Sequence, residues 1–211
     1  MLAVIVLFDR FTALDAVGPY DVLSSLPGAE VVFAAHQPGP VANEKGTLRL
    51  MADAALADVP APDVIVVPGG PGQHAHMDDQ GLLGWLRTAD ARSAWTTSVC
   101  TGSLLLASAG LLRGRRATTH WLALDELAGL GAVPATGRVV TDGKYMTAAG
   151  VSAGLDMALV LAGKLAGDAV AQSVQLALEY DPQPPYQAGS PATAPQAIAD
   201  ALRARRDQIL T

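Results

Sequence analysis

Short apolar or β-branched runs alternate with longer stretches of helical period, and this alternation restricts the fold more than any other feature of the chain. The strand-like runs are LAVIVLF (2–8), EVVFAAH (30–36), DVIVVP (63–68) and AWTTSV (94–99). Strands that are apolar along their length are covered on both faces, and alternation with helices is typical of βαβ units. The sequence therefore predicts an α/β fold with a mostly parallel sheet and helices on both faces.

The stretches between and after these strands have helical period and end at Gly, Pro or Asp. The predicted helices are 16–25, 79–91, 101–110, 121–129, 153–166, 168–180 and 193–209. Asp142-Gly143 tolerates the positive φ of a tight turn, which predicts a small antiparallel hairpin at 138–148. The Pro-rich segment YDPQPPYQAGSPATAP is expected to form an extended surface strap before the last helix.

Length and charge limit the class of protein and of partner. With 211 residues, half of them hydrophobic, residues 1–211 are expected to form a single domain. The net charge of −6 gives no electrostatic footprint for nucleic acid or anionic lipid. A small molecule or a second copy of the chain is the expected partner.

The N-terminus indicates the cellular compartment, and the single cysteine limits the possible cross-links and metal sites. MLAVIVLFDRFTALD has neither a basic leader nor a plain cleavage site, so we expect a first strand and a cytoplasmic protein. No apolar run approaches the roughly 20 residues needed to cross a bilayer, so no membrane role is expected. One cysteine can form neither an internal disulfide nor a CxxC metal site.

That cysteine, Cys100, lies between the last strand-like run and a predicted helix. Ser98 and Gly102 flank it at two residues' distance, which is the pattern of a nucleophile elbow, where larger side chains would collide at the strand-to-helix turn. Such a turn holds the nucleophile in a strained conformation with an exposed sulfur, next to helix N–H groups that favour thiolate. The alternative is inert apolar filling, a common role of free cysteine.

Two further motifs could supply partners. In PGGPG (68–72), Gly69 and Gly70 follow a strand and could present backbone N–H groups to an oxyanion, together with the Thr101 N–H, although such glycines also simply make turns. Asp15 has apolar neighbours that would raise its carboxyl pKa for acid/base work, but an N-cap role explains it equally well. Asp9 and Asp21 are alternative candidates for the acid/base role, but we expect Asp9 to lie in a turn and Asp21 on a solvated helix face.

Four histidines are present, and we expect no metal site. Thr118 and Thr119 suggest a short strand leading to His120. The other three, His36, His74 and His76, are expected in loops. The HxH pair at 74 and 76 could ligate a metal, but the sequence offers no further ligand at suitable spacing.

These residues resemble the flavodoxin-like ThiJ/PfpI superfamily, and the isocyanide (isonitrile) hydratases in particular. The resemblance runs through LFDRFTALDAVGPYDVL, VIVVPGGPG, TSVCTGSLLLASAGLLRGRRATTHW and QLALEYDPQPPYQAGSPATAP. It implies a flavodoxin-like sandwich, a Cys100 nucleophile, Asp15 as acid/base and a supporting Thr101. It also implies that Gly70, the Thr101 amide and His120 line the pocket, that no cofactor is needed and that the protein is a homodimer. With Gly69 from the glycine-rich loop, the predicted substrate-binding residues are Gly69, Gly70 and His120.

The activity that the resemblance implies is hydration of an isocyanide to an N-substituted formamide through a covalent cysteine thioimidate. The chain departs from the hydratase pattern at Ala148 and Ala149, because the corresponding stretch of the hydratases is richer in glycine. A PfpI-type peptidase would have His after the nucleophile, where this chain has Thr101. The alternatives are a glyoxalase or deglycase acting on reactive carbonyls, and a non-catalytic ligand or redox sensor related to AraC-type regulators.

Overall fold

A seven-stranded sheet forms the centre of the computed structural model, which describes residues 1–211. Its order is β10-β11-β7-β6-β1-β2-β5, and every neighbouring pair is parallel except β10 with β11. The strands are β1 (Leu2–Val6), β2 (Glu30–Ala35), β5 (Ala54–Ala55), β6 (Val64–Val67), β7 (Trp95–Val99), β10 (Val139–Asp142) and β11 (Tyr145–Ala148). The mostly parallel sheet is confirmed.

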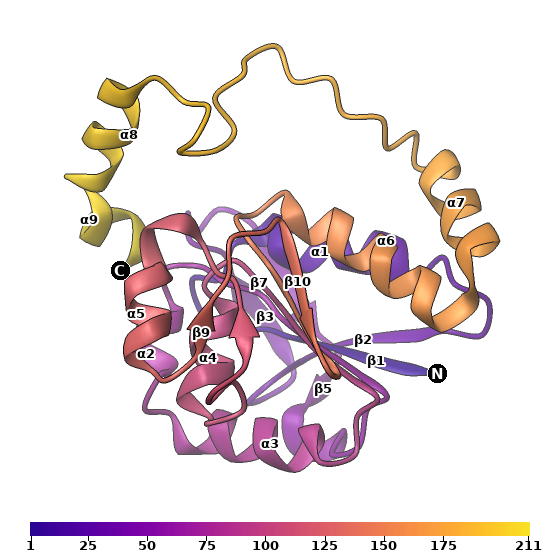
Figure 1. Ribbon diagram of the computed structural model, residues 1–211. Helices are drawn as coiled ribbons and strands as arrows, with labels where there is room; N and C mark the ends of the chain where they lie inside the picture. The colour runs from indigo at the N-terminus through magenta and orange to yellow at the C-terminus, as the bar shows by residue number, and fades with distance from the viewer.

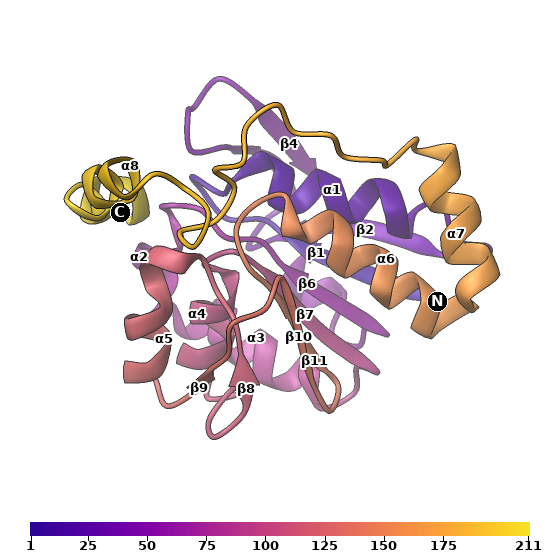
Figure 2. The same ribbon diagram turned by 45° about the horizontal axis from the view of Figure 1, so that its top comes forward.

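Helices cover both faces of this sheet (Figures 1 and 2). On one face α1 (Ala13–Leu23) packs against α6 (Ala153–Ala166), and α7 (Asp168–Ala177) packs against α6. On the other face lie α3 (Gln80–Asp90) and α4 (Gly102–Ser108), with α2 (Gln73–His76) and α5 (Leu124–Gly129) beside α4. The predicted sandwich is therefore confirmed.

The hairpin at 138–148 is also confirmed. Asp142 pairs with Tyr145 across the turn, and Gly143 is the first of the two loop residues, with a φ of 62° that glycine readily adopts. Because β11 also pairs in parallel with β7, the hairpin forms one edge of the central sheet.

Several short elements differ from the sequence prediction. The pair β3 (Gly39–Ala42) with β4 (Arg49–Ala52) was not predicted. The short strand expected at Thr118 and Thr119 lies instead at β8 (Arg116–Ala117), and its partner β9 (Val133–Pro134) was not predicted. These strands are only two to four residues long, too short for a periodic signal.

Two predicted helices are divided, and two short helical segments were missed. The segment 121–129 is a 3₁₀ turn, η2 (Trp121–Ala123), followed by α5, and the segment 193–209 is α8 (Gln196–Arg203) followed by α9 (Arg206–Leu210). Another 3₁₀ turn, η1 (Leu56–Asp58), follows β5. His74 and His76 belong to α2 rather than to a loop.

The core extends through the sheet and its covering helices. One cluster of 47 buried residues includes all of β6 and reaches from Ala3 to Leu210. The strap lies on the surface as predicted, because residues 181–193 are exposed and arch between α7 and α8 (Figure 1). Bends and a turn at residues 191–193 interrupt the extended course that the sequence predicted. None of the helices combines the length and the apolar character that a membrane crossing requires.

Candidate active site

The turn from β7 to α4 holds Cys100 in a left-handed conformation. Its φ of 56° is unfavourable for a residue with a side chain, which confirms the strained elbow. A Cβ at Gly102 would lie 2.1 Å from the Val67 carbonyl oxygen, and one at Gly69 would lie 2.5 Å from the Thr101 nitrogen. Only glycine fits at these two positions, so the sequence imposes the elbow through close backbone approach.

Hydrogen bonds fix the backbone of Cys100 on both sides. Its N–H donates to the Ala149 carbonyl at 2.8 Å and to the Ala148 carbonyl at 3.1 Å, at the carboxyl end of β11. Thr119 Oγ1 donates to the Cys100 carbonyl at 3.0 Å, and Ser103 Oγ donates to it at 3.3 Å. Three separate segments therefore over-determine the strained conformation.

The sulfur environment differs from the sequence prediction. Cys100 is only 6% exposed, so its sulfur is not the exposed group expected of an elbow. Burial, and then the charge of Asp15, raise the pKa of the Cys100 thiol well above 9. The N–H groups of Thr101 and Val151 act in the opposite direction but are outweighed. The helix N–H group of Thr101 does favour thiolate as expected, but burial and the charge of Asp15 outweigh it, so the thiolate is not favoured overall.

Asp15 lies beside this thiol in the first turn of α1. The N-cap of α1 is Thr12, so the N-cap interpretation of Asp15 was wrong. Instead Asp15 Oδ2 accepts a 2.9 Å hydrogen bond from the Gly69 N–H, while Oδ1 is buried with no hydrogen-bond partner. Burial raises the pKa of Asp15 from 3.8 to about 8, partly offset by the Gly69 hydrogen bond. Asp15 therefore carries a proton at neutral pH, as a general acid requires.

A second carboxyl group, that of Glu44, acts on Asp15. Glu44 is in the turn between β3 and β4, and its Oε2 is buried with no hydrogen-bond partner. Its charge contributes to the raised pKa of Asp15. Glu44 could not be predicted as a site residue, because only tertiary packing brings this turn to Asp15.

Thr101, Gly69 and Gly70 form the polar frame around this pair. Thr101 Oγ1 accepts a 3.0 Å hydrogen bond from the Gly70 N–H, and Gly70 has a φ of 132°. The amides of Gly69 and Gly70 are thus directed at Asp15 and Thr101 respectively. They position the two side chains, and contact with a substrate stays a prediction for both glycines.

A pocket of about 590 Å³ lies near the thiol, although the buried Cys100 and Asp15 side chains are not part of its lining. It is lined by Ala149 and Val151, which lie next to Cys100, and by His120. His120 Nδ1 accepts a 3.4 Å hydrogen bond from the Leu122 N–H, and burial lowers the His120 pKa, so the ring is neutral at pH 7. The position expected for His120 as a pocket-lining residue agrees with this arrangement.

Other pocket residues were not singled out in the sequence. The strap contributes Gly189 to Ala192, and the β10 side contributes Arg138, which pairs with Asp156. The strap was recognised as a surface segment, but its course over the pocket has no local signal. The competing residues Asp9 and Asp21 are exposed, and the other three histidines do not line this pocket.

Comparison with known proteins assigns the family. The DJ-1/PfpI family model matches residues 1–164. Isonitrile hydratase of Pseudomonas putida is 49% identical over 199 residues, which are 94% of this chain and 87% of that protein. A deglycase of Pyrococcus abyssi is 27% identical over 149 residues, which are 70% of this chain and 89% of that protein.

A solved relative shares nearly the whole structure. The crystal structure of a ThiJ/PfpI family protein from Pseudomonas syringae matches with a TM-score of 0.95 and 37% identity, over 99% of this chain and 87% of that one. Because the match covers 99% of this chain, it includes both the strap and the elbow at Cys100. The chain belongs to the DJ-1/PfpI family.

Proposed function

We propose that this protein is an isocyanide hydratase, a hydro-lyase that converts R–N≡C and water to an N-substituted formamide. The geometry that carries the proposal is the fully buried Asp15 carboxyl, held by the Gly69 amide beside the strained Cys100 turn, with a pocket close by. The similarity to an isonitrile hydratase supports this choice of substrate. Cys100 is the nucleophile and Asp15 the acid/base.

The first step forms a covalent thioimidate. The Cys100 sulfur attacks the terminal carbon of the isocyanide, and the proton of Asp15 moves to that carbon, giving R–N=CH–S–Cys. The thiol proton takes its place on Asp15, so the carboxyl group ends the step protonated. Oδ1 is the oxygen suited to this exchange, because Oδ2 is already held by the Gly69 amide.

The second step hydrolyses the thioimidate. Asp15 protonates the imidate nitrogen, and the resulting carboxylate removes a proton from the water that attacks the carbon. Collapse of the tetrahedral intermediate breaks the C–S bond, the hydroxyl proton passes through Asp15 to the sulfur, and R–NH–CHO leaves. Because burial disfavours the Cys100 thiolate, return of the sulfur to the protonated thiol is favourable.

The pocket suits an uncharged, largely apolar R group. Leu14, Trp121, Leu124 and Val151 contribute apolar side chains to its wall. Its one cationic group, Arg138, is paired with Asp156 and donates to Ser152 Oγ at 3.1 Å. With Arg138 engaged in this way, the pocket offers no free charge to a charged substrate.

The alternative is a glyoxalase or deglycase activity on reactive carbonyls. The similarity to a deglycase supports it, at lower identity than the hydratase match. The family resemblance associates that chemistry with Glu and an assisting His, whereas this chain has Asp15 and a neutral His120 held by the Leu122 amide. We therefore place the hydratase first.

The test is turnover of an aromatic isocyanide, followed by the absorbance of the formamide product. Wild type is expected to turn over, and Cys100→Ala and Asp15→Asn are expected to be inactive. Lactate from methylglyoxal, with no formamide, would replace the hydratase by the glyoxalase activity. If neither product forms and Cys100 is selectively oxidised by peroxide, the sensor alternative replaces both enzymes.

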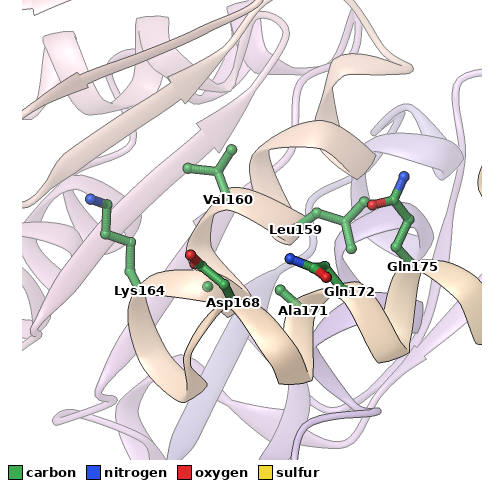
Figure 3. A pocket seen from close by; sticks show the side chains of 8 residues that line it. Leu159, Val160, Lys164, Asp168, Ala171, Gln172 and Gln175 are labelled. Atoms are coloured by element: carbon green, nitrogen blue, oxygen red, sulfur yellow. The ribbon is translucent and has the colours of Figure 1, made fainter.

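The proposal includes a homodimer, formed through α7 and the strap. Val160 on α6, Leu176 on α7 and Tyr186 in the strap are 43%, 77% and 80% exposed. A groove of about 430 Å³ runs between α6 and α7, and Leu159, Val160, Gln172 and Gln175 lie along it (Figure 3). A second copy of the chain would cover these exposed apolar side chains.

The strap gives the reason to expect a second copy of the chain. None of residues 182–189 makes a backbone–backbone hydrogen bond, and this exposed segment packs on no helix or strand through its backbone. A partner surface that covers the strap would hold it in place. Light scattering is expected to give a dimer mass for wild type and a monomer mass for Leu176→Glu/Tyr186→Asp, and a monomeric wild type would contradict the dimer.

Two further expectations accompany the proposal. Residues 1–211 form a single domain, which the continuous core supports. The cytoplasm and the absence of a nucleic-acid partner stay predictions from the sequence, and fractionation and a DNA-binding assay would test them.

A further inference from the structure

Two histidines and an aspartate from distant parts of the chain lie close together, and none of them lines the pocket near Cys100. His36 directly follows β2, His76 ends α2, and Asp79 precedes α3. His36 Nε2 lies 2.5 Å from Asp79 Oδ2, and His76 Nδ1 lies 3.0 Å from the same oxygen. One nitrogen from each histidine and one oxygen of the aspartate all lie within 4.8 Å of one another.

The Asp79 carboxylate is oriented from behind by the helix that it caps. Oδ1 accepts hydrogen bonds of 3.0 Å from the Gly81 N–H and 3.1 Å from the Leu82 N–H. These bonds leave Oδ2 facing the two imidazoles. Outer hydrogen bonds of this kind hold a ligating carboxylate in place at protein metal sites.

The remaining groups also fit a ligand role. The Phe8 ring packs against His76 with 5.3 Å between centroids, which restrains that imidazole. Partial burial acts to raise the pKa of Asp79, but hydrogen bonds from His36 and His76 and from the Leu82 amide outweigh it and lower the pKa to about 2.

We propose that His36 Nε2, His76 Nδ1 and Asp79 Oδ2 form a binding site for Zn²⁺ or a similar borderline divalent transition metal. Two imidazole nitrogens and one carboxylate oxygen are a donor set suited to such ions. Water completes the coordination, because the His36 side chain is 51% exposed and the site opens to solvent.

The geometry needs only a small adjustment. Ligand bonds of about 2.0–2.1 Å in a tetrahedral site place donor atoms about 3.3 Å apart. The two nitrogen-to-oxygen distances of 2.5 and 3.0 Å would therefore lengthen by less than an ångström. His36 is free to supply most of this shift, since half of its side chain is exposed.

The site would fasten the segment that follows the glycine-rich loop. His76 and Asp79 lie just after Gly69 and Gly70, whose amides hold Asp15 and Thr101, and α2 packs against α4. A bound metal would tie this segment to the end of β2. The metal-binding inference is independent of the proposed hydratase function, because it rests on none of the catalytic residues.

The expectation of no metal considered only the HxH pair at 74 and 76. The structure instead pairs His76 with His36 and Asp79, while His74 is exposed and outside the cluster. His74 lies on the same short helix and has the same chemistry, so it provides a matched control.

The experiment is calorimetric titration of tag-free protein, stripped with a chelator and dialysed, with ZnCl₂. Wild type is expected to bind one Zn²⁺ per chain. His36→Gln, His76→Gln and Asp79→Asn are expected to weaken binding by about 10-fold or more. Asp79→Asn retains a helix cap, because Asn is as good an N-cap residue as Asp.

His74→Gln and Cys100→Ala are expected to bind Zn²⁺ like wild type, which separates the site from the other helix histidine and from the thiol. Zn²⁺ should also raise Tm in wild type and His74→Gln but not in His36→Gln, and circular dichroism checks that each variant is folded. The proposal is overturned if wild type binds no Zn²⁺ at concentrations on the order of 1 mM, far above the dissociation constant of a specific zinc site. Binding that survives His36→Gln but is lost in His74→Gln or Cys100→Ala overturns it as well.

Discussion

The Gly69 amide donates a 2.9 Å hydrogen bond to Asp15 Oδ2 and thereby joins two segments that are 54 residues apart in the sequence. Because this bond occupies one carboxyl oxygen, the other is left for the thiol side of the site. Asp15 is fully buried, so a single backbone donor fixes the orientation of a proton-carrying group that has no solvent contact. The relationship links the glycine-rich loop to acid/base chemistry.

The reactivity of Cys100 is expected to depend on Asp15. The charge of Asp15 helps to raise the thiol pKa, so Asp15→Asn should shift the pH midpoint of Cys100 alkylation by iodoacetamide to a lower value. Asp21→Asn, an exposed aspartate on the same helix, is the control and should leave the midpoint unchanged. An unshifted midpoint in Asp15→Asn would show that the two groups do not interact.

The stability of the protein is expected to fall with pH through Asp15. Its folded pKa of about 8 lies above the unfolded value of 3.8, so its contribution to stability is complete at low pH and is lost as pH rises to about 8. The free energy of unfolding should therefore decrease by about 3 kcal/mol between about pH 5.5 and pH 8 from this group.

Urea unfolding of wild type and Asp15→Asn at both pH values measures this effect. The difference in unfolding free energy between the two proteins should change with pH, because Asn does not titrate. Asp21→Asn again serves as the control. Parallel pH profiles for wild type and Asp15→Asn would contradict the buried, protonated carboxyl group.

The fold followed from the sequence wherever a run was long and periodic. The strands β1, β2, β6 and β7 lie within two residues of their predicted ends, because continuous apolar runs have few other solutions. The two-residue strands β8 and β9 have no such signal, since their pairing depends on segments that meet only in the folded chain.

The sequence predicted the site only where the residues that form it are close together along the chain. The elbow at Cys100 could be predicted because Ser98 and Gly102 are its neighbours in sequence. Glu44 and the Val151 amide could not, because they reach the site through tertiary packing. The direction of the Cys100 pKa was predicted wrongly for the same reason, since burial depends on the whole fold.

Glu44 is expected to tune the acid/base group. Because its charge contributes to the raised pKa of Asp15, Glu44→Gln should lower that pKa. The alkaline limb of the pH–rate profile, where Asp15 loses its proton, should then move to lower pH, while Glu30→Gln on an exposed strand end should not move it. An alkaline limb that is identical in wild type and Glu44→Gln would separate Glu44 from the reaction.

Gly102 is expected to be the glycine at the elbow that tolerates substitution least. A Cβ there would meet the Val67 carbonyl oxygen at 2.1 Å, and this oxygen belongs to a buried central strand that cannot move aside. Gly102→Ala should therefore lower the free energy of unfolding by about 3 kcal/mol or more and abolish activity, because strain of this kind is among the most damaging effects of a point mutation. Gly84→Ala in α3 is the matched control, since its Cβ would meet nothing closer than 4.0 Å. That variant should be neutral or more stable by about 0.5–1 kcal/mol, as expected for Gly to Ala inside a helix. Denaturant unfolding measures both variants, and a Gly102→Ala protein as stable as Gly84→Ala would show that strand and helix can separate at the elbow.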